Sequence, residues 1–189
     1  ATLDEVNTSI GERLGVDFGG PGTPFDRAYR EELKRSGLDD SEYHELIEAD
    51  VGDRQVMDTL LRERGIETVL HFAAHTIVPE SVRDPLKYYG NNTCSTRSLL
   101  AACSANGVRE FVFSSTAAVY GMPAAGEADE LTATAPINPY GMSKLMSEHM
   151  LRDLCAATSM RHVILRYFNV AGCDPGGRIG QSTLNATLL

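Results

Sequence analysis

Short apolar runs alternate with amphipathic segments along the chain from about residue 46 onward. Between residues 54 and 64 apolar side chains recur at helical spacing and stop before Gly65, which predicts a helix that ends at a glycine. Residues 68–72 form a near-continuous apolar run, which is typical of a strand buried on both faces. The same pattern predicts a short strand at 46–51, a long helix at 84–105, a strand at 111–113, a helix at 140–157 and a strand at 162–168.

This alternation of strands and helices predicts a parallel sheet with right-handed crossover connections, and therefore an α/β fold. Ligands of such sheets bind beyond the carboxyl ends of the strands. Chemistry is therefore expected among the residues that follow Phe72, Phe113 and Phe168.

The first 45 residues have a different character. Glycines and prolines crowd residues 11–27, which predicts a loop. Residues 25–38 are rich in Arg, Glu and Lys and end near Gly37, which predicts a solvated helix. We therefore expect an atypical loop and helix segment at 1–45, followed by one folded domain at 46–189.

Composition and charge narrow the class of protein. The chain has 189 residues, of which 42% are hydrophobic and 23% charged, as in ordinary globular domains. Its net charge of −9 argues against a nucleic-acid partner, because such binders need a basic face. No run of ~18 apolar residues and no secretory leader pattern is present, so no membrane association is expected. The cysteines form no Cys-x-x-Cys pair or zinc spacing, which favours free thiols in a cytoplasmic protein without a metal.

Candidate chemistry lies at Thr116, Tyr140 and Lys144. Thr116 follows the strand at 111–113, and Tyr140 and Lys144 are spaced i and i+4, so both lie on one helix face. A phenol has a pKa near ~10, and a nearby ammonium favours its ionised form, so such a pair can remove a proton from an alcohol. A Tyr-x-x-x-Lys pair is also common by chance in helices, where the tyrosine packs and the lysine is exposed. The Ser-Ser-Thr strand end and the alternating fold favour the catalytic interpretation.

Seven segments, taken in order, resemble the extended short-chain dehydrogenase/reductase family, and within it the UDP-glucose 4-epimerases. They run from about residue 48 to 181. They include EADVGD (48–53), HFAA (71–74), ESVRDPLKYY (80–89), NN (91–92), FSSTAAVYG (113–121), NPYGMSK (138–144) and LRYFNVAG (165–172).

The resemblance implies a Rossmann-like, doubly wound parallel sheet that binds NAD. It implies epimerisation at C4 of a UDP-hexose, UDP-glucose or UDP-galactose, through a transient 4-keto sugar, in galactose and carbohydrate metabolism. Tyr140 would be the base, Lys144 its partner and a ribose ligand, and Thr116 a helper at a position where many members carry Ser.

The resemblance also implies binding residues. The cofactor would contact Asp4, Asp50, Val51, Phe72, Ala73, Ala74, Thr76, Asn91, Ser114, Tyr140, Lys144 and Phe168. Thr116, Tyr140 and Asn169 would contact the UDP-sugar. The helices that contain Asn91 and Tyr140 would form a homodimer interface.

Two departures from the family shape the expectation for the chain. No Gly-x-x-Gly-x-x-Gly turn, which holds the cofactor pyrophosphate in the family, precedes residue 48. The family's C-terminal part, which closes over UDP, would begin at about Leu189. We therefore expect the middle of such an enzyme, with a sheet that lacks its N-terminal strand.

Alternatives to an epimerase remain open from the sequence. Related dehydratases place Asp-Glu after the catalytic Thr, whereas this chain has Ala117 and Ala118, which favours epimerisation over dehydration or decarboxylation. A different sugar-nucleotide enzyme of the same family is the second hypothesis. The third is a catalytically inactive fragment or interaction module that has kept the three residues without capturing the cofactor.

Overall fold

The computed structural model describes residues 47, 49–123 and 126–170. The chain divides into two compact units, residues 1–50 and 51–189, and every helix and strand given below lies in the second. The loop expected at 11–27 and the helix expected at 25–38 lie outside the described residues.

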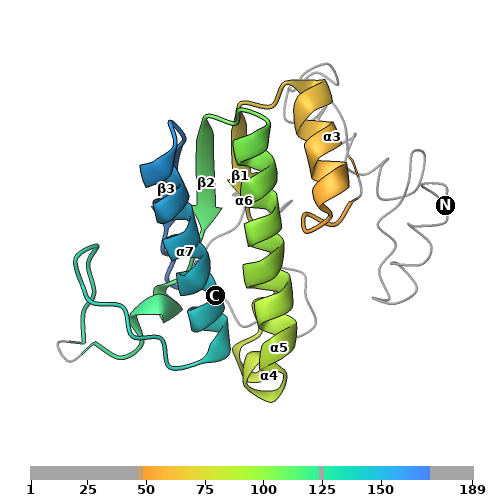
Figure 1. Cartoon of the computed structure of the whole chain (residues 1–189). Coiled ribbons are helices and arrows are strands. Elements are labelled where there is room, and N and C mark those ends of the chain that lie inside the picture. The colour runs from red at the N-terminus through yellow and green to blue at the C-terminus, as the bar shows by residue number, and fades with distance from the viewer. Residues whose placement is uncertain (1–46, 48, 124–125, 171–189) are drawn as a thin grey trace, which may run out of the picture. The chain divides into compact units, whose positions relative to one another are not determined.

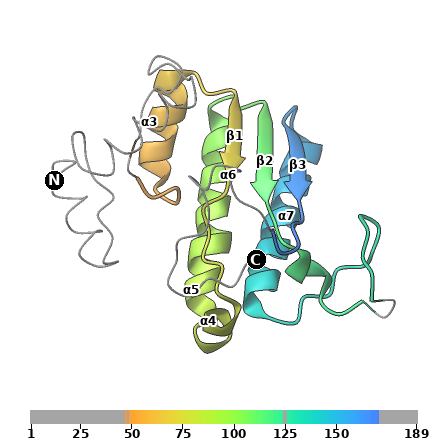
Figure 2. The ribbon, with the colours of Figure 1, turned by 180° about the vertical axis from the view of Figure 1, so that it is seen from behind.

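Three parallel strands form the sheet of the described region: β1 (Thr68–His71), β2 (Glu110–Ser114) and β3 (Arg161–Leu165), in the order β1-β2-β3. Val69 pairs with Phe111, and Phe113 pairs with Ile164. In both ribbon views α6 (Ser95–Ala105) and α7 (Pro139–Ala157) lie on the same side of the sheet (Figures 1 and 2). The parallel pairing confirms the predicted α/β fold.

The first helix of the described region, α3 (Arg54–Arg64), has the predicted bounds. The Asp53 carboxylate accepts the backbone N–H groups of Gln55 and Val56, which satisfies donors that a helix start leaves open. Gly65 ends the helix with φ 58°, in the left-handed region that glycine adopts without strain. Local sequence signals therefore determine both ends of α3.

The long helix expected at 84–105 consists of three consecutive parts. They are α5 (Pro85–Tyr88), a π-helical turn η1 (Tyr89–Cys94) and α6, which ends at Ala105 and is capped by Asn106. A short helix that the sequence pattern did not predict, α4 (Val78–Arg83), precedes them. Periodicity thus located the helix but not its π turn, which is held by contacts with α7 that are described below.

Two strand predictions need correction. The strand expected at 46–51 is wrong over its described part: Ile47, Ala49 and Asp50 have no regular structure, and Val51 begins a turn. A strand needs a neighbour for its backbone groups, and the described sheet pairs no strand there. The strand expected at 162–168 ends at Leu165, because its partner strand β2 ends at Ser114, the residue that pairs with Leu165.

The main core lies between the helices and the sheet. Its buried members include Leu61 of α3, Leu100 of α6, Phe111 of β2 and Leu151 of α7. On the other face of the sheet, Leu70 is 60% exposed and Val163 is 52% exposed within the described region. The helices that the structure describes thus bury one face of the sheet.

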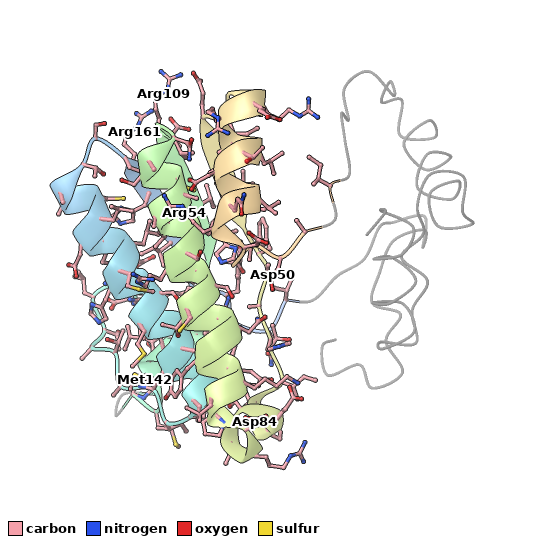
Figure 3. The ribbon with its side chains drawn as sticks, turned by 45° about the vertical axis from the view of Figure 1, so that its right-hand side comes forward. Asp50, Arg54, Asp84, Arg109, Met142 and Arg161 are labelled. Carbon is pink, nitrogen blue, oxygen red and sulfur yellow. The ribbon has the colours of Figure 1, made fainter. Side chains whose placement is uncertain are left out.

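The carboxyl ends of the strands lie toward the first turns of α5 and α7. Arg109 and Arg161 mark the amino ends of β2 and β3, and in Figure 3 they lie at the opposite end from Asp84 and Met142. Asp84 caps α5, and Met142 lies in the first turn of α7. The carboxyl ends of the strands therefore approach the helix turns that carry the candidate residues. No helix among residues 47, 49–123 and 126–170 has the length and apolar character needed to cross a membrane.

Candidate active site

Thr116 follows the carboxyl end of β2 and begins the short 3₁₀ turn η2 (Ala117–Tyr120). Its backbone is extended, and its Oγ1 accepts the N–H of Ala118 at 3.2 Å. Because the hydroxyl oxygen acts as the acceptor in this contact, the hydroxyl proton can be donated to a bound molecule. The capping contact therefore fixes the hydroxyl at the sheet edge without using its proton.

Lys144 is buried on α7, with only 3% of its surface exposed. Its Nζ donates to the carbonyl oxygen of Ser114 at 2.8 Å and lies 5.0 Å from the centre of the Phe113 ring. Burial lowers the pKa of Lys144 to about 8, so the side chain is still mainly an ammonium at pH 7. One carbonyl uses one of three ammonium protons, which leaves donors for a ligand.

Tyr140 lies in the first turn of α7, one helical turn before Lys144. This turn starts at Pro139, and the Asn138 side chain caps it by accepting the N–H of Gly141 at 2.8 Å. Proline at the first position and a capping asparagine are strong start signals, which explains why the sequence placed this helix to within one residue.

The first turn of α7 packs directly on the turn that follows Thr116. A Cβ added to Gly141 would lie 2.7 Å from the carbonyl oxygen of Ala118 and 3.0 Å from the Cβ of Pro136. Only a residue without a side chain fits this approach. The close packing brings together the two segments that carry Thr116 and Tyr140.

Tyr88, which the sequence analysis did not single out, lies against Tyr140. The two rings meet edge to face, with centroids 6.4 Å apart. The Tyr88 hydroxyl donates toward the carbonyl of Ile77 at 2.7 Å and the carboxylate of Glu80 at 2.8 Å. Burial, and then Glu80, raise the pKa of Tyr88 to about 12, so this phenol stays protonated beside Tyr140. Its position inside the segment 80–89 was the only sequence signal that could have indicated it.

Asn92, to which the sequence analysis assigned no role although it lies in the resembling segment 91–92, is a second supporting residue. It is buried in η1, where its Oδ1 accepts the N–H of His75 at 2.8 Å and its Nδ2 donates to the carbonyl of His75 at 3.0 Å. The same Nδ2 lies 3.1 Å from Ser143 Oγ, which donates to the carbonyl of Tyr140 at 2.7 Å. Asn92 thus ties the loop after β1 to the first turn of α7.

The predicted cofactor residues, and Asn169, which was predicted to contact the UDP-sugar, occupy different kinds of position. Phe72 and Phe168, after β1 and β3, are 57% and 65% exposed. Exposed side chains are also found at Asp50, Ala73, Thr76 and Asn169, whereas Ala74, Asn91 and Ser114 are half-buried. Val51 packs against the main core, so its side chain has a structural role. Asp4 lies outside the described residues.

His71 is buried, as expected for a core histidine. Its Nε2 lies 2.8 Å from Thr96 Oγ1, within hydrogen-bond distance. Burial, and then the charge of Lys144, lower the pKa of His71 to about 4, so the ring is neutral at pH 7. The ammonium of Lys144 is therefore not opposed by a second positive charge on His71.

A model of the NAD dependent epimerase/dehydratase family matches residues 23–186. The chain is 54% identical over 144 residues to a UDP-glucose 4-epimerase of Azospirillum brasilense, which covers 76% of this chain and 41% of the relative. It is 44% identical to a probable UDP-arabinose 4-epimerase of Arabidopsis thaliana, over 73% of this chain and 34% of that protein. The chain therefore spans less than half the length of these relatives.

Solved structures give the same result for the fold. The UDP-glucose 4-epimerase of Bifidobacterium longum in complex with NAD⁺ and UDP matches with a TM-score of 0.75 and 36% identity, over 86% of this chain and 48% of that one. The UDP-Glc/GlcNAc 4-epimerase of Campylobacter jejuni matches with a TM-score of 0.70 and 40% identity, over 88% and 49% of the two chains. These matches confirm the Rossmann-like character of the fold.

Proposed function

Because this chain belongs to the NAD dependent epimerase/dehydratase family, we propose that it carries the catalytic residues of a UDP-hexose 4-epimerase. The reaction would interconvert UDP-glucose and UDP-galactose through a 4-keto sugar. One observation carries the proposal most directly. The buried ammonium of Lys144 is held on the carbonyl of Ser114, one helical turn from Tyr140 and next to the strand end that presents Thr116.

The carboxyl edge of the sheet suits a dinucleotide. Exposed Phe72 and Phe168 follow the two outer described strands and offer apolar surfaces for planar rings, and Lys144 has donors for ribose hydroxyls. NAD, when bound, supplies the hydride acceptor and donor for the reaction. The residues that we propose to hold it are Asp4, Asp50, Val51, Phe72, Ala73, Ala74, Thr76, Asn91, Ser114, Tyr140, Lys144 and Phe168.

The chain's own residues would manage the proton of the sugar. Tyr140 takes the proton of the 4-hydroxyl, while Thr116 donates a hydrogen bond to the same oxygen. The Lys144 charge favours the ionised form of the phenol, which is the form that can accept this proton. Tyr88 stays protonated, so it does not compete as a base. Asn169, exposed after β3, would contact the sugar nucleotide.

The two residues after Thr116 favour epimerisation over loss of water. Elimination needs an acid and a base beside the sugar. At these positions the chain offers only the methyl groups of Ala117 and Ala118, and Ala117 packs against the small cluster around buried Val119. The site therefore supports proton removal at one oxygen without a second acid–base pair at these two positions.

We also propose a cytoplasmic homodimer, in galactose metabolism, that is joined through the helices of Asn91 and Tyr140. Met146 on α7 is 43% exposed, and Cys94 in η1 is exposed as well. Light scattering of the purified chain tests this assembly. We expect a dimer at micromolar concentration that Met146→Lys weakens. A wild-type chain that is monomeric at this concentration would contradict the proposal.

The experiment that tests the activity begins with the purified full chain. It is denatured, and the released NAD is quantified; the native chain is then assayed for conversion of UDP-galactose to UDP-glucose. We expect bound NAD and turnover, with Tyr140→Phe as a folded control that loses ~100-fold or more of the rate. No NAD after incubation with excess cofactor, together with no turnover, would contradict the proposal.

A further inference from the structure

Glu148 is a buried carboxylate that the proposed reaction does not use. It lies on α7, one turn after Lys144, and none of its side chain is exposed. Its oxygens accept Ser115 Oγ at 2.5 Å and the guanidinium of Arg166 at 2.6 and 3.0 Å. Arg152, whose side chain is 44% exposed, approaches from outside at 3.2 Å. A carboxylate in such a place is costly unless it is paired, and here both oxygens have partners.

The partners of Glu148 are the residues next to the candidate site. Ser115 lies between Ser114, whose carbonyl holds Lys144, and Thr116. Its backbone N–H donates to the carbonyl of Leu165 at 2.8 Å, so Ser115 also joins the ends of β2 and β3. A shift of the Ser115 side chain therefore displaces the carbonyl before it and the hydroxyl after it.

Arg166, the residue directly after β3, reinforces this arrangement. Its two-nitrogen contact fixes the orientation of the Glu148 carboxylate. Its guanidinium also lies 4.8 Å from the centre of the Tyr120 ring, at the end of the turn that begins after Thr116. Glu148 and Arg166 thus hold both ends of the segment 115–120.

Buried ion pairs can often be replaced by apolar groups without loss of stability, so stability alone is a weak reason for this one. Its location gives a better reason. We propose that Glu148 is a positioning residue that, through Ser115 and Arg166, sets the placement of the Ser114 carbonyl against Lys144 and of the Thr116 hydroxyl. This inference rests on the proposed function for its catalytic consequence, and on the geometry alone for its effect on Lys144.

The test compares Glu148→Gln and Ser115→Ala in the full chain. Ser115→Ala removes the link to the strand end and leaves the ion pair, while Glu148→Gln keeps the shape and removes the charge. Arg152→Gln is the matched control, because it removes the outer partner without touching Ser115. Melting temperature and NAD content are measured first, so that lost folding is recognised.

The first readout is titration of Lys144 by ¹⁵N NMR of lysine side chains. The chain has only three lysines, Lys34, Lys87 and Lys144, so assignment needs one Lys144→Met spectrum. Two other titratable side chains need to be considered in this titration. His71 on β1 is buried, and its pKa responds to the charge of Lys144, but the ring stays neutral above pH 6. Tyr140 lies one turn before Lys144 on the same face of α7. We expect Ser115→Ala and Glu148→Gln to move the Lys144 midpoint by about half a pH unit or more, and Arg152→Gln to leave it in place.

The second readout is epimerase kinetics. We expect Ser115→Ala to lower kcat by ~10-fold at unchanged KM, because the Ser114 carbonyl and the Thr116 hydroxyl lose their placement. A merely structural role would lower the folded fraction and leave the kcat of the folded molecules unchanged.

The two readouts separate the two proposals. If the wild-type chain neither binds NAD nor turns over, the proposed function fails, and the NMR titration still decides the role of Glu148. If the Lys144 midpoint is the same in the wild type, Ser115→Ala and Glu148→Gln, the positioning role is wrong, whatever the activity.

Discussion

The two halves of α7 bury different kinds of side chain. The first half buries polar and charged groups, among them Ser143, Lys144, Ser147 and Glu148, each 3% exposed or less. The second half contributes Leu151 to the main apolar core, with Met150 and Leu154 partly packed against it. Burial of polar groups in the first half costs desolvation free energy, but their hydrogen bonds fix the positions of the site residues. Burial of apolar surface in the second half stabilises the fold. Substitutions in one helix should separate function from stability.

The largest separation is expected for Lys144→Met. Activity should fall by ~10³-fold, because the ammonium beside Tyr140 is lost. Burial lowers the pKa of Lys144 from 10.5 to about 8. Below pH 8 the buried charge therefore lowers the free energy of unfolding of the wild type by its full amount, and this destabilisation disappears as the pH rises from 8 to 10.5. The variant should thus be more stable at pH 7 by up to ~3 kcal/mol, with a flatter pH dependence from 8 to 10.5. Urea unfolding at several pH values measures this, and a destabilised variant at pH 7 would contradict it.

Gly141→Ala should come next. The new methyl group would meet the Ala118 carbonyl at 2.7 Å, so α7 and the turn after Thr116 must move apart. We expect a loss of stability of ~1–3 kcal/mol and a fall in kcat of ~100-fold. Gly90→Ala is the matched control, since a Cβ there has open space among the described residues. Equal effects of the two substitutions would show that the close approach does not matter.

Leu151→Ala should do the reverse of Lys144→Met. Leu151 is 1% exposed in the core, so its truncation should cost ~3 kcal/mol of unfolding free energy. The kcat of the folded fraction should stay within twofold of the wild type, because Leu151 packs in the main apolar core, two helical turns after Lys144. Activity corrected for folded fraction, from circular dichroism and turnover on one sample, tests this expectation.

The smallest effect is expected for Ser147→Ala. Its Oγ lies 3.0 Å from the carbonyl of Ser143 and 3.2 Å from that of Asn92, so the hydroxyl links α7 to η1. Removal should cost ~1 kcal/mol and leave the pH profile of turnover unchanged. A shift of that profile would contradict this expectation. It would mean that Ser147 acts together with Lys144 as part of the site.

The sequence predicted those parts of the fold and of the candidate site that are determined by residues close together in the chain. The glycine that ends α3, the proline before Tyr140 and the i, i+4 pair Tyr140 and Lys144 are all local patterns, and the helices predicted over these segments agree with the structure. The strand expected at 46–51 failed because an apolar run does not say whether a partner strand is available.

The supporting side chains depend on tertiary contacts and could not be found in this way. Asn92 and Ser143 are 51 positions apart, and Ser115 and Glu148 are 33 apart. Nothing in the local pattern around Asn92 or Glu148 distinguishes a buried network from a solvated helix face. The roles that the sequence assigned to Asp50, Phe72, Asn91 and the other cofactor residues stay predictions.

The π turn at Tyr89–Cys94 has a consequence for insertions and deletions. A π turn holds one residue more than an α turn, and each residue advances a helix by about 100°. The extra residue therefore rotates all that follows, so that Tyr88 before it faces Tyr140 and Thr96 after it faces His71. Deletion of a single residue here would restore a regular helix and turn one of these two faces away from its partner. The segment should therefore tolerate no change of length.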